Sequence, residues 1–144
     1  MQSLAKWLVE GRIILAQGTL ASDILNYRNQ MIADMMTESG QQPLVHLIID
    51  YRGADNKTDE ALRLRYYVDA QHDGGNQALI KHPLLGWSIS VDPPGVVVKL
   101  AASIISQQNN YRWHHTPTGA EALDFLATRD STLPDLTPFK EHID

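Results

Sequence analysis

Acidic, basic and hydroxyl side chains cluster between residues 50 and 63 of this 144-residue chain. They follow the strand predicted at residues 45–50, in which the apolar run 47–49 does not alternate and therefore predicts a central strand buried on both faces. Ligands of open α/β sheets collect at the carboxyl ends of the strands, which is where these side chains would lie. We expect a binding site here, and its members are Asp50, Arg52, Thr58, Asp59 and Arg63.

Motifs for metal binding or catalysis do not accompany this cluster. Asp55, Lys57 and Asp59 superficially resemble a calcium loop, but Lys57 stands where an oxygen ligand is needed and the required glycine is missing. His114 and His115 are adjacent on a predicted strand, so they point to opposite faces and cannot chelate one ion. No His-Glu-x-x-His pair, Gly-x-Ser-x-Gly elbow or glycine-rich phosphate loop occurs. We expect no metal, no cofactor and no catalytic residue.

Composition excludes several classes of partner. Twelve Lys and Arg against seventeen Asp and Glu give a net charge of −5, without the basic stripe that nucleic acids require. The chain has no Cys, which removes disulfides, thiol catalysis and thiolate-bound zinc. No window approaches the ~18 apolar residues of a membrane span, and Lys6, Glu10 and Arg12 interrupt the apolar pieces of the N-terminus, which lacks a secretory pattern. We expect a cytoplasmic protein without stable membrane insertion.

The elements that position the cluster alternate between strands and helices. Apolar stretches on either side of Gly11-Arg12 predict an N-terminal β-hairpin. Further strands are predicted at residues 45–50, 87–91 and 111–116, and helices at residues 24–36, 58–70, 97–105 and 118–126. Thr118 and Glu121 form a capping box at the start of the last helix.

Strands separated by single helices predict an α/β fold with a mostly parallel sheet, to which the hairpin adds an antiparallel edge. We expect a single domain over residues 1–129 and a C-terminal extension without regular structure over residues 130–144. Residues 72–86 predict a long loop with at most a short helical turn around residues 78–81. Trp7, Trp87 and Trp113 fall on predicted strands, where they either pack helices onto the sheet or line a pocket.

Several segments match a known pattern: residues 13–20, 46–50, 87–91 and 120–123. Together with the element order, they resemble the STAS domains of the SpoIIAA-like superfamily, whose founding member is a bacterial anti-sigma-factor antagonist. The resemblance covers about residues 7 to 127 and implies a SpoIIAA-like fold with about four helices. It also implies a bacterial regulatory protein that acts by protein–protein contact.

In that family, a Ser or Thr at the start of the second helix is phosphorylated by a partner kinase, where backbone N–H groups meet the phosphate. The matching position here is Thr58 or Asp59. The Asp-Ser-Ser-Gly type motif of the family is replaced by Thr58-Asp59-Glu60-Ala61. Thr58 is therefore either a helix cap or a phosphosite; if Asp59 holds the place of the serine, a permanent charge replaces the phosphate.

Three functions follow as hypotheses. The first is a non-enzymatic STAS-like interaction module that binds an unknown protein, such as a kinase-type regulator, or forms a homodimer through the edge of its hairpin. The alternative is a small-molecule or lipid-binding domain, in which residues 72–86 are a lid over an apolar ligand. The third is an enzyme that uses Asp50 and a histidine within hydrogen-bond reach.

Overall fold

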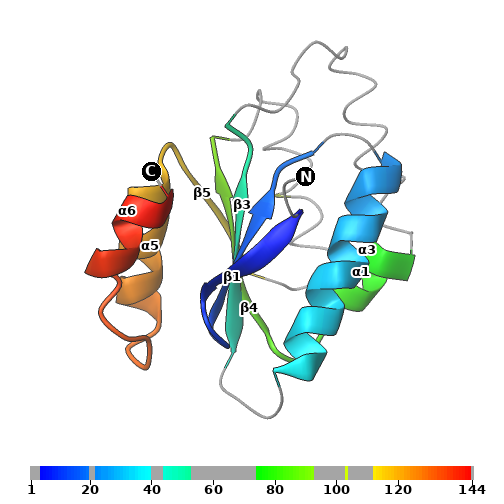
Figure 1. Ribbon diagram of the computed structural model, residues 1–144, viewed down its shortest axis with the longest axis horizontal. Helices are drawn as coiled ribbons and strands as arrows, with labels where there is room; N and C mark the ends of the chain where they lie inside the picture. Colours follow the sequence, from blue (N-terminus) through cyan, green and yellow to red (C-terminus); the bar gives the residue numbers. More distant parts are fainter. Residues whose placement is uncertain are drawn as a thin grey trace.

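A computed structural model describes residues 4–19, 22–39, 44–52, 74–92, 103 and 112–143. Its centre is a five-stranded sheet in the order β1-β2-β3-β4-β5 (Figure 1). The strands are β1 (Ala5–Val9), β2 (Ile13–Gln17), β3 (Val45–Asp50), β4 (Leu85–Val91) and β5 (Arg112–Thr116). β1 pairs antiparallel with β2, and every later pair is parallel. The predicted α/β fold, a mostly parallel sheet with an N-terminal antiparallel hairpin, is confirmed.

The turn of the hairpin depends on one glycine. Gly11 has φ of +75°, a conformation that residues with a side chain rarely adopt. The backbone N–H of Arg12 donates to the carbonyl of Val9 at 2.9 Å and closes the turn. The pairing shifts register between Trp7 and Val9, so β1 carries an irregularity just before this turn.

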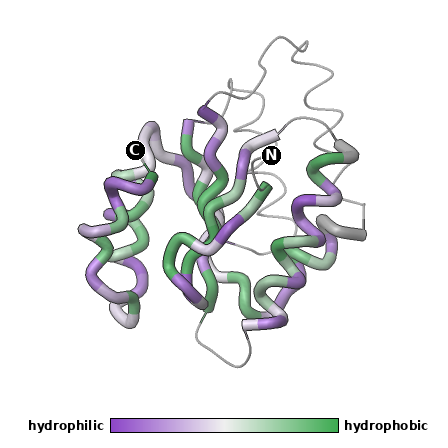
Figure 2. Tube along the Cα trace, in the orientation of Figure 1, coloured by the Kyte–Doolittle hydropathy of each residue, from purple (hydrophilic) through white to green (hydrophobic). Residues whose placement is uncertain are grey.

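Helices cover both faces of the sheet. α1 (Ser22–Glu38) and α3 (Gly74–Ile80) lie on one face. α5 (Gly119–Arg129) and α6 (Lys140–Ile143), joined through the 3-10 turn η1 (Thr137–Phe139), lie on the other (Figure 1). The strands between these layers are mostly hydrophobic (Figure 2). Residues 45–49 of β3 are all buried, as the apolar run at residues 47–49 predicts for a central strand.

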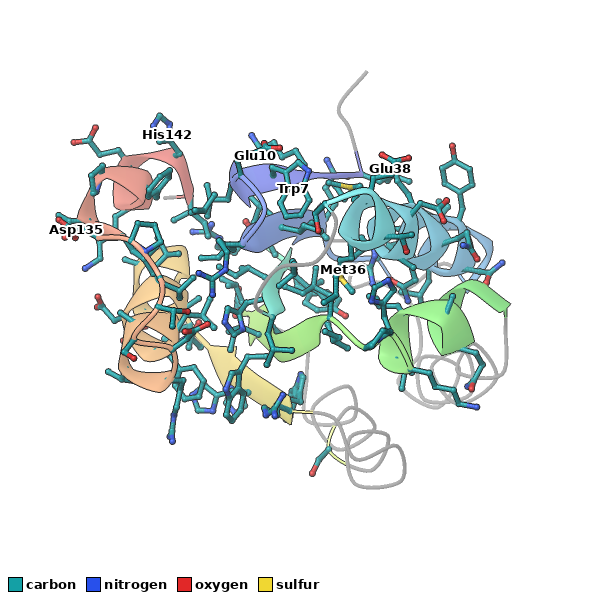
Figure 3. All side chains as sticks on the ribbon, turned by 90° about the horizontal axis from the view of Figure 1, so that it is seen from below. Trp7, Glu10, Met36, Glu38, Asp135 and His142 are labelled. Atoms are coloured by element: carbon teal, nitrogen blue, oxygen red, sulfur yellow. The ribbon has the colours of Figure 1, made fainter. Side chains whose placement is uncertain are left out.

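The alternation of side chains along the strands divides the core into two clusters, one on each face of the sheet. The cluster under α1 and α3 includes Met36, and Trp7 packs against it (Figure 3). Its buried strand residues are Ala5, Ile14, Ala16, Val45, Leu47, Ile49 and Leu85. The buried members of the cluster under α5 and α6 are Val9, Ile13, Ile48, Ile89, Val91, Ala122, Leu123, Leu126, Leu136 and Ile143.

Two sequence-based expectations are wrong. Residues 74–80 form the helix α3, and Leu79 and Leu85 are buried in the core, so this part of the predicted loop 72–86 is packed structure. The C-terminal extension also has regular structure, because it contains η1 and α6. Leu136 and Ile143 are buried in the cluster that α5 forms with the sheet, and this burial holds the extension against the sheet.

Other helix predictions have mixed outcomes. The N-cap of the predicted capping box is confirmed, since the Glu121 N–H donates to the Thr118 hydroxyl at 3.2 Å, and this hydroxyl also contacts the Glu121 carboxylate at 3.1 Å. The first predicted helix is present and extends to residues 22–38. The helices predicted at residues 58–70 and 97–105 lie outside the described residues, apart from Ser103, which is helical.

Candidate functional site

Asp50 and Arg52 meet at the carboxyl edge of the sheet, where β3 ends. Arg52 Nε donates to Asp50 Oδ1 at 2.9 Å, and Arg52 Nη2 donates to Asp50 Oδ2 at 2.8 Å. The same Nη2 donates to the backbone carbonyl of Ile143, at the end of α6. Two of the expected site residues therefore form an ion pair, and this pair also contacts the C-terminal helix α6. The other three, Thr58, Asp59 and Arg63, lie outside the described residues.

Backbone hydrogen bonds continue the sheet past the strand ends at this edge. The Gly18 N–H donates to the carbonyl of Asp50 at 2.7 Å, and the Tyr51 N–H donates to the carbonyl of Val91 at 2.9 Å. The Tyr51 ring is buried directly against Gly18, where an added Cβ would lie 2.4 Å from it. Only glycine leaves room for this ring, so the carboxyl edge is rigidly packed around Asp50.

A buried arginine of α1 contacts the end of β2 at this edge. Arg28 of α1 is 1% exposed, although it occupies the apolar side of that helix. Its Nη1 donates to the carbonyl of Gln17, the last residue of β2, at 2.8 Å, and its Nε and Nη2 donate to Asn29 Oδ1. A buried guanidinium is stable only when its donors are bonded. Arg28 is not among the site residues that the sequence predicts, although a charge at an apolar helix position is a detectable signal.

A second polar network lies at the opposite, amino edge of the parallel strands. The Asp130 carboxylate, just after α5, accepts hydrogen bonds from Arg12 Nη2 and from the His46 ring at Nε2, each at 2.8 Å. Its other oxygen accepts from the Thr132 hydroxyl and, at 3.0 Å, from the Thr132 N–H. His46 Nδ1 accepts from the Trp87 N–H at 3.0 Å. Both oxygens of the carboxylate and both ring nitrogens of His46 are therefore engaged.

These contacts fix the charge of the network. Burial lowers the pKa of His46 and outweighs the opposing effect of Asp130. Because Nδ1 accepts from a backbone N–H, the neutral ring carries its proton on Nε2, toward Asp130. The pKa of Asp130 is lowered to about 2, since the hydrogen bonds from Thr132 and His46 outweigh its own desolvation. The network is thus a neutral histidine, an ionised aspartate and the Arg12 guanidinium.

This arrangement does not make His46 a proton-transfer group. A general base needs a free ring nitrogen within reach of the substrate, and both nitrogens of His46 are engaged by Trp87 and Asp130. His46 and Asp50 are four positions apart on one extended strand, roughly 13 Å along the chain. No histidine of the described segments is hydrogen bonded to Asp50, which accepts from Arg52 and, through its carbonyl, from Gly18.

Two other histidines take part in packing. His82, before β4, is hydrogen bonded through Nε2 to the Thr37 hydroxyl of α1 at 2.9 Å, and burial lowers its pKa. The His114 ring of β5 stacks on Phe125 of α5 at 3.9 Å between centroids, and burial lowers its pKa as well. Each ring connects a helix to the sheet or to its neighbouring loop.

Within the described part of the chain, no group of three or more His, Asp or Glu side chains is arranged to hold a metal ion. None of the helices described there combines the length and apolar character needed to cross a membrane. No family model, curated protein or solved structure matches this chain. The geometry of the two sheet edges is therefore the basis for a functional assignment.

Proposed function

We propose that this protein is a non-enzymatic, STAS-like interaction module that binds a partner protein through the carboxyl edge of its sheet. The observation that carries the proposal is the sheet itself. An antiparallel hairpin precedes parallel strands laid down in chain order, which is the element order that underlies the resemblance to STAS domains. The proposed working surface comprises Asp50, Arg52 and the following residues Thr58, Asp59 and Arg63.

The polar side chains described at this edge favour binding over catalysis. Asp50 is held by Arg52, and Arg52 is held by the carbonyl of Ile143. Arg28 is buried and bonded to Gln17 and Asn29, so it supports this edge from inside and does not itself face a partner. Charges fixed in this way present a constant electrostatic pattern to a partner, whereas acid–base catalysis requires a group that gains and loses a proton.

Pairing of two copies through the hairpin is disfavoured, so a different chain is the proposed partner. β1 is one edge strand of the sheet, and its outer side is where two copies would pair through their hairpins. It is five residues long, carries the exposed Lys6 and has an irregular register between Trp7 and Val9. Short length, lysine and bulges are features by which proteins prevent edge-to-edge pairing.

The experiment that tests the proposal is affinity capture with cross-linking from a lysate of the source organism, using the full chain. Wild type should be cross-linked through residues 50–63 to one protein, a kinase-type regulator in the STAS interpretation. Asp59→Lys should reduce this capture at least about tenfold, because it reverses a charge at the proposed centre of contact. Intact mass of the protein from its own cells would show whether Thr58 carries phosphate.

Asp34→Lys is the matched control, since it makes the same charge change on the exposed side of α1, where Asp34 accepts from Gln30 four positions away. It should leave capture unchanged. Equal capture by wild type and Asp59→Lys would contradict the proposal, and so would equal losses with the two variants. A homodimer in light scattering, with no other partner captured, would overturn the heterotypic part.

A further inference from the structure

A pocket of about 410 Å³ opens at the amino edge of the sheet, away from the proposed interaction surface. It lies at the starts of β3, β4 and β5, where the end of α5 approaches them. Its lining residues are Leu44, His46, Trp87, Arg112, Arg129, Asp130 and Thr132. The volume lies in the lower part of the range of small-molecule sites, roughly 300–1,000 Å³.

The strand registers place the floor of the pocket. Trp87 of β4 is the pairing partner of Arg112 of β5, so these two side chains stand next to each other on the α5 face. His46 of β3 lies on the same face, with its ring against the Trp87 backbone. The floor is thus a row across three adjacent strands, built on the rigid part of the fold.

The charge of the pocket is positive in an acidic chain. Asp130 is fully engaged by Arg12, His46 and Thr132, so its carboxylate is neutralised within the network. Neither Arg112 nor Arg129 forms an ion pair with any residue that the structure describes. Two guanidinium groups therefore face the pocket, although the whole chain has a net charge of −5. Such a site attracts anions.

Arg129 is held in place by aromatic rings. Its guanidinium lies 4.8 Å from the Phe125 ring centroid and 5.6 Å from the Trp87 ring centroid. The two rings meet edge to face at 5.0 Å, which fixes the orientation of the indole. A guanidinium held by ring stacking keeps its N–H donors available for a carboxylate or a phosphate.

We propose that this pocket binds a small aromatic anion, a flat ring that carries a carboxylate or phosphate group. Arg112 and Arg129 bind the acidic group, and the half-buried Trp87 supplies the apolar surface against which the ring packs. The ionised Asp130 and neutral His46 form the inner wall and position the floor through Trp87. The pocket lies at the edge opposite the proposed interaction surface. A negative result for one proposal therefore leaves the other unaffected.

The test is a titration of the full chain with four probes: 2-naphthoate, 2-naphthyl phosphate, inorganic phosphate and naphthalene. Binding is followed by calorimetry and by the ¹H–¹⁵N signals of the Trp87 indole and of the arginine side chains. The two aryl anions should bind and shift the Trp87 indole signal. Arg112→Gln and Arg129→Gln should each weaken their binding about 10- to 100-fold, since each removes a hydrogen-bonded charge.

Lys6→Gln is the matched control, because it removes one positive charge from β1 at the other end of the sheet order. It should leave the affinity unchanged. Arg129→Gln also removes the contacts of Arg129 with two aromatic rings and could unfold the protein for that reason. If it does, the affinity of Arg112→Gln alone tests the proposal. A preference for 2-naphthoate or for 2-naphthyl phosphate, which share one ring system, shows whether the site favours a carboxylate or a phosphate.

Three results would overturn the proposal. The first is no binding of either aryl anion at millimolar concentration. The second is inorganic phosphate or naphthalene binding as tightly as the aryl anions, because the site would then recognise only the charge or only the ring. The third is equal affinity of wild type and Arg112→Gln, which would place the binding elsewhere on the chain.

Discussion

The hydrogen bond between His46 and Asp130 ties the charge state of one residue to that of the other. The neutral ring donates from Nε2 to an ionised carboxylate, and Nδ1 accepts from the Trp87 N–H. Protonation at Nδ1 would place two N–H groups against each other and break the contact with β4. The folded state therefore disfavours the charged ring, which agrees with its lowered pKa.

Stability should fall in two steps as pH decreases. The pKa of His46 is below its ordinary 6.5 in the folded state, so its contribution is complete above pH 6.5 and is lost below it. The pKa of Asp130 is about 2 against an ordinary 3.8, so its contribution is lost as pH falls from 3.8 toward 2. Both shifts have the same sign, because in each case the unfolded chain binds more protons. Denaturant midpoints measured between pH 8 and pH 2 check this.

NMR titration of individual rings resolves the contribution of His46. Burial also lowers the pKa of His82 and His114, so the first step is shared among three histidines. The His46 ring should titrate below 6.5, and Asp130→Asn should reduce the step below pH 3.8, which Asp130 shares with Asp135, whose pKa is also lowered by hydrogen bonds from Thr137. That variant should also cost about 3 kcal/mol at neutral pH, since Arg12 loses its carboxylate. A His46 ring that titrates above 6.5 would contradict the assigned network.

At the scale of elements, the pairing of β3 with β4 contains one extra residue. Val45 pairs with Leu85 and Leu47 pairs with Ser88, so β4 bulges opposite His46. A Cβ on Gly86 would lie 2.5 Å from His46 Nδ1 and 2.7 Å from its Cε1. The bulge and the glycine together let the imidazole ring approach the backbone of β4.

Gly86→Ala should destabilise the fold by about 1–3 kcal/mol, the usual cost of overpacking a core. The added methyl group must displace the His46 ring and break its bonds to Trp87 and Asp130. Denaturant unfolding measures the loss. Gly11→Asn is the control, because Gly11 has no atom within 4 Å of an added Cβ and Asn tolerates its positive φ. Equal effects of the two substitutions would contradict the role given to Gly86.

The elements that the sequence predicts are those with continuous local patterns. The strands β1 to β5, α1 and α5 are visible as apolar runs, helical periodicity or a capping box. α3 was missed because it begins with two glycines and has only seven residues. The tail was missed because its two prolines suggest a loop, although Leu133, Leu136, Phe139 and Ile143 recur every three or four positions.

The polar sites also differ in whether the local sequence predicts them. Asp50 and Arg52 are two residues apart, so their pairing follows from the local sequence. Asp130 lies 118 positions from Arg12 and 84 from His46, and only the completed sheet brings these residues together. Arg112 and Arg129 share a pocket for the same reason, because the strand register and the end of α5 place them. No periodicity along the chain reports such long-range contacts.

At the scale of the whole molecule, the C-terminal tail completes the face of the sheet opposite α1. Leu136 and Ile143 are buried in the cluster under α5 and α6, and Leu133 and Phe139 pack against it. Polar contacts hold both ends of the tail: Arg12 Nη1 donates to the Thr132 carbonyl at 3.1 Å, and Arg52 donates to the Ile143 carbonyl. The tail is therefore part of the folded core.

Removal of residues 131–144 should destabilise the protein by at least about 3 kcal/mol, because the buried side chains of Leu136 and Ile143 each contribute about 1.5–3 kcal/mol. The denaturant midpoint of the truncated chain measures this loss. If the truncated chain does not fold, Leu136→Ala measures the same packing in a milder form and should cost about 2–4 kcal/mol.

Two point variants separate the apolar and polar parts of this attachment. Arg52→Ala removes the bond to Ile143 and should increase hydrogen exchange in residues 137–143 without affecting α1. Lys140→Ala breaks the exposed ion pair with Asp124 and should change stability by less than about 1 kcal/mol, since surface pairs contribute little. If truncation and Lys140→Ala had equally small effects, the tail would be a surface appendage. A large effect of truncation alone would show that residues 131–144 complete the hydrophobic core.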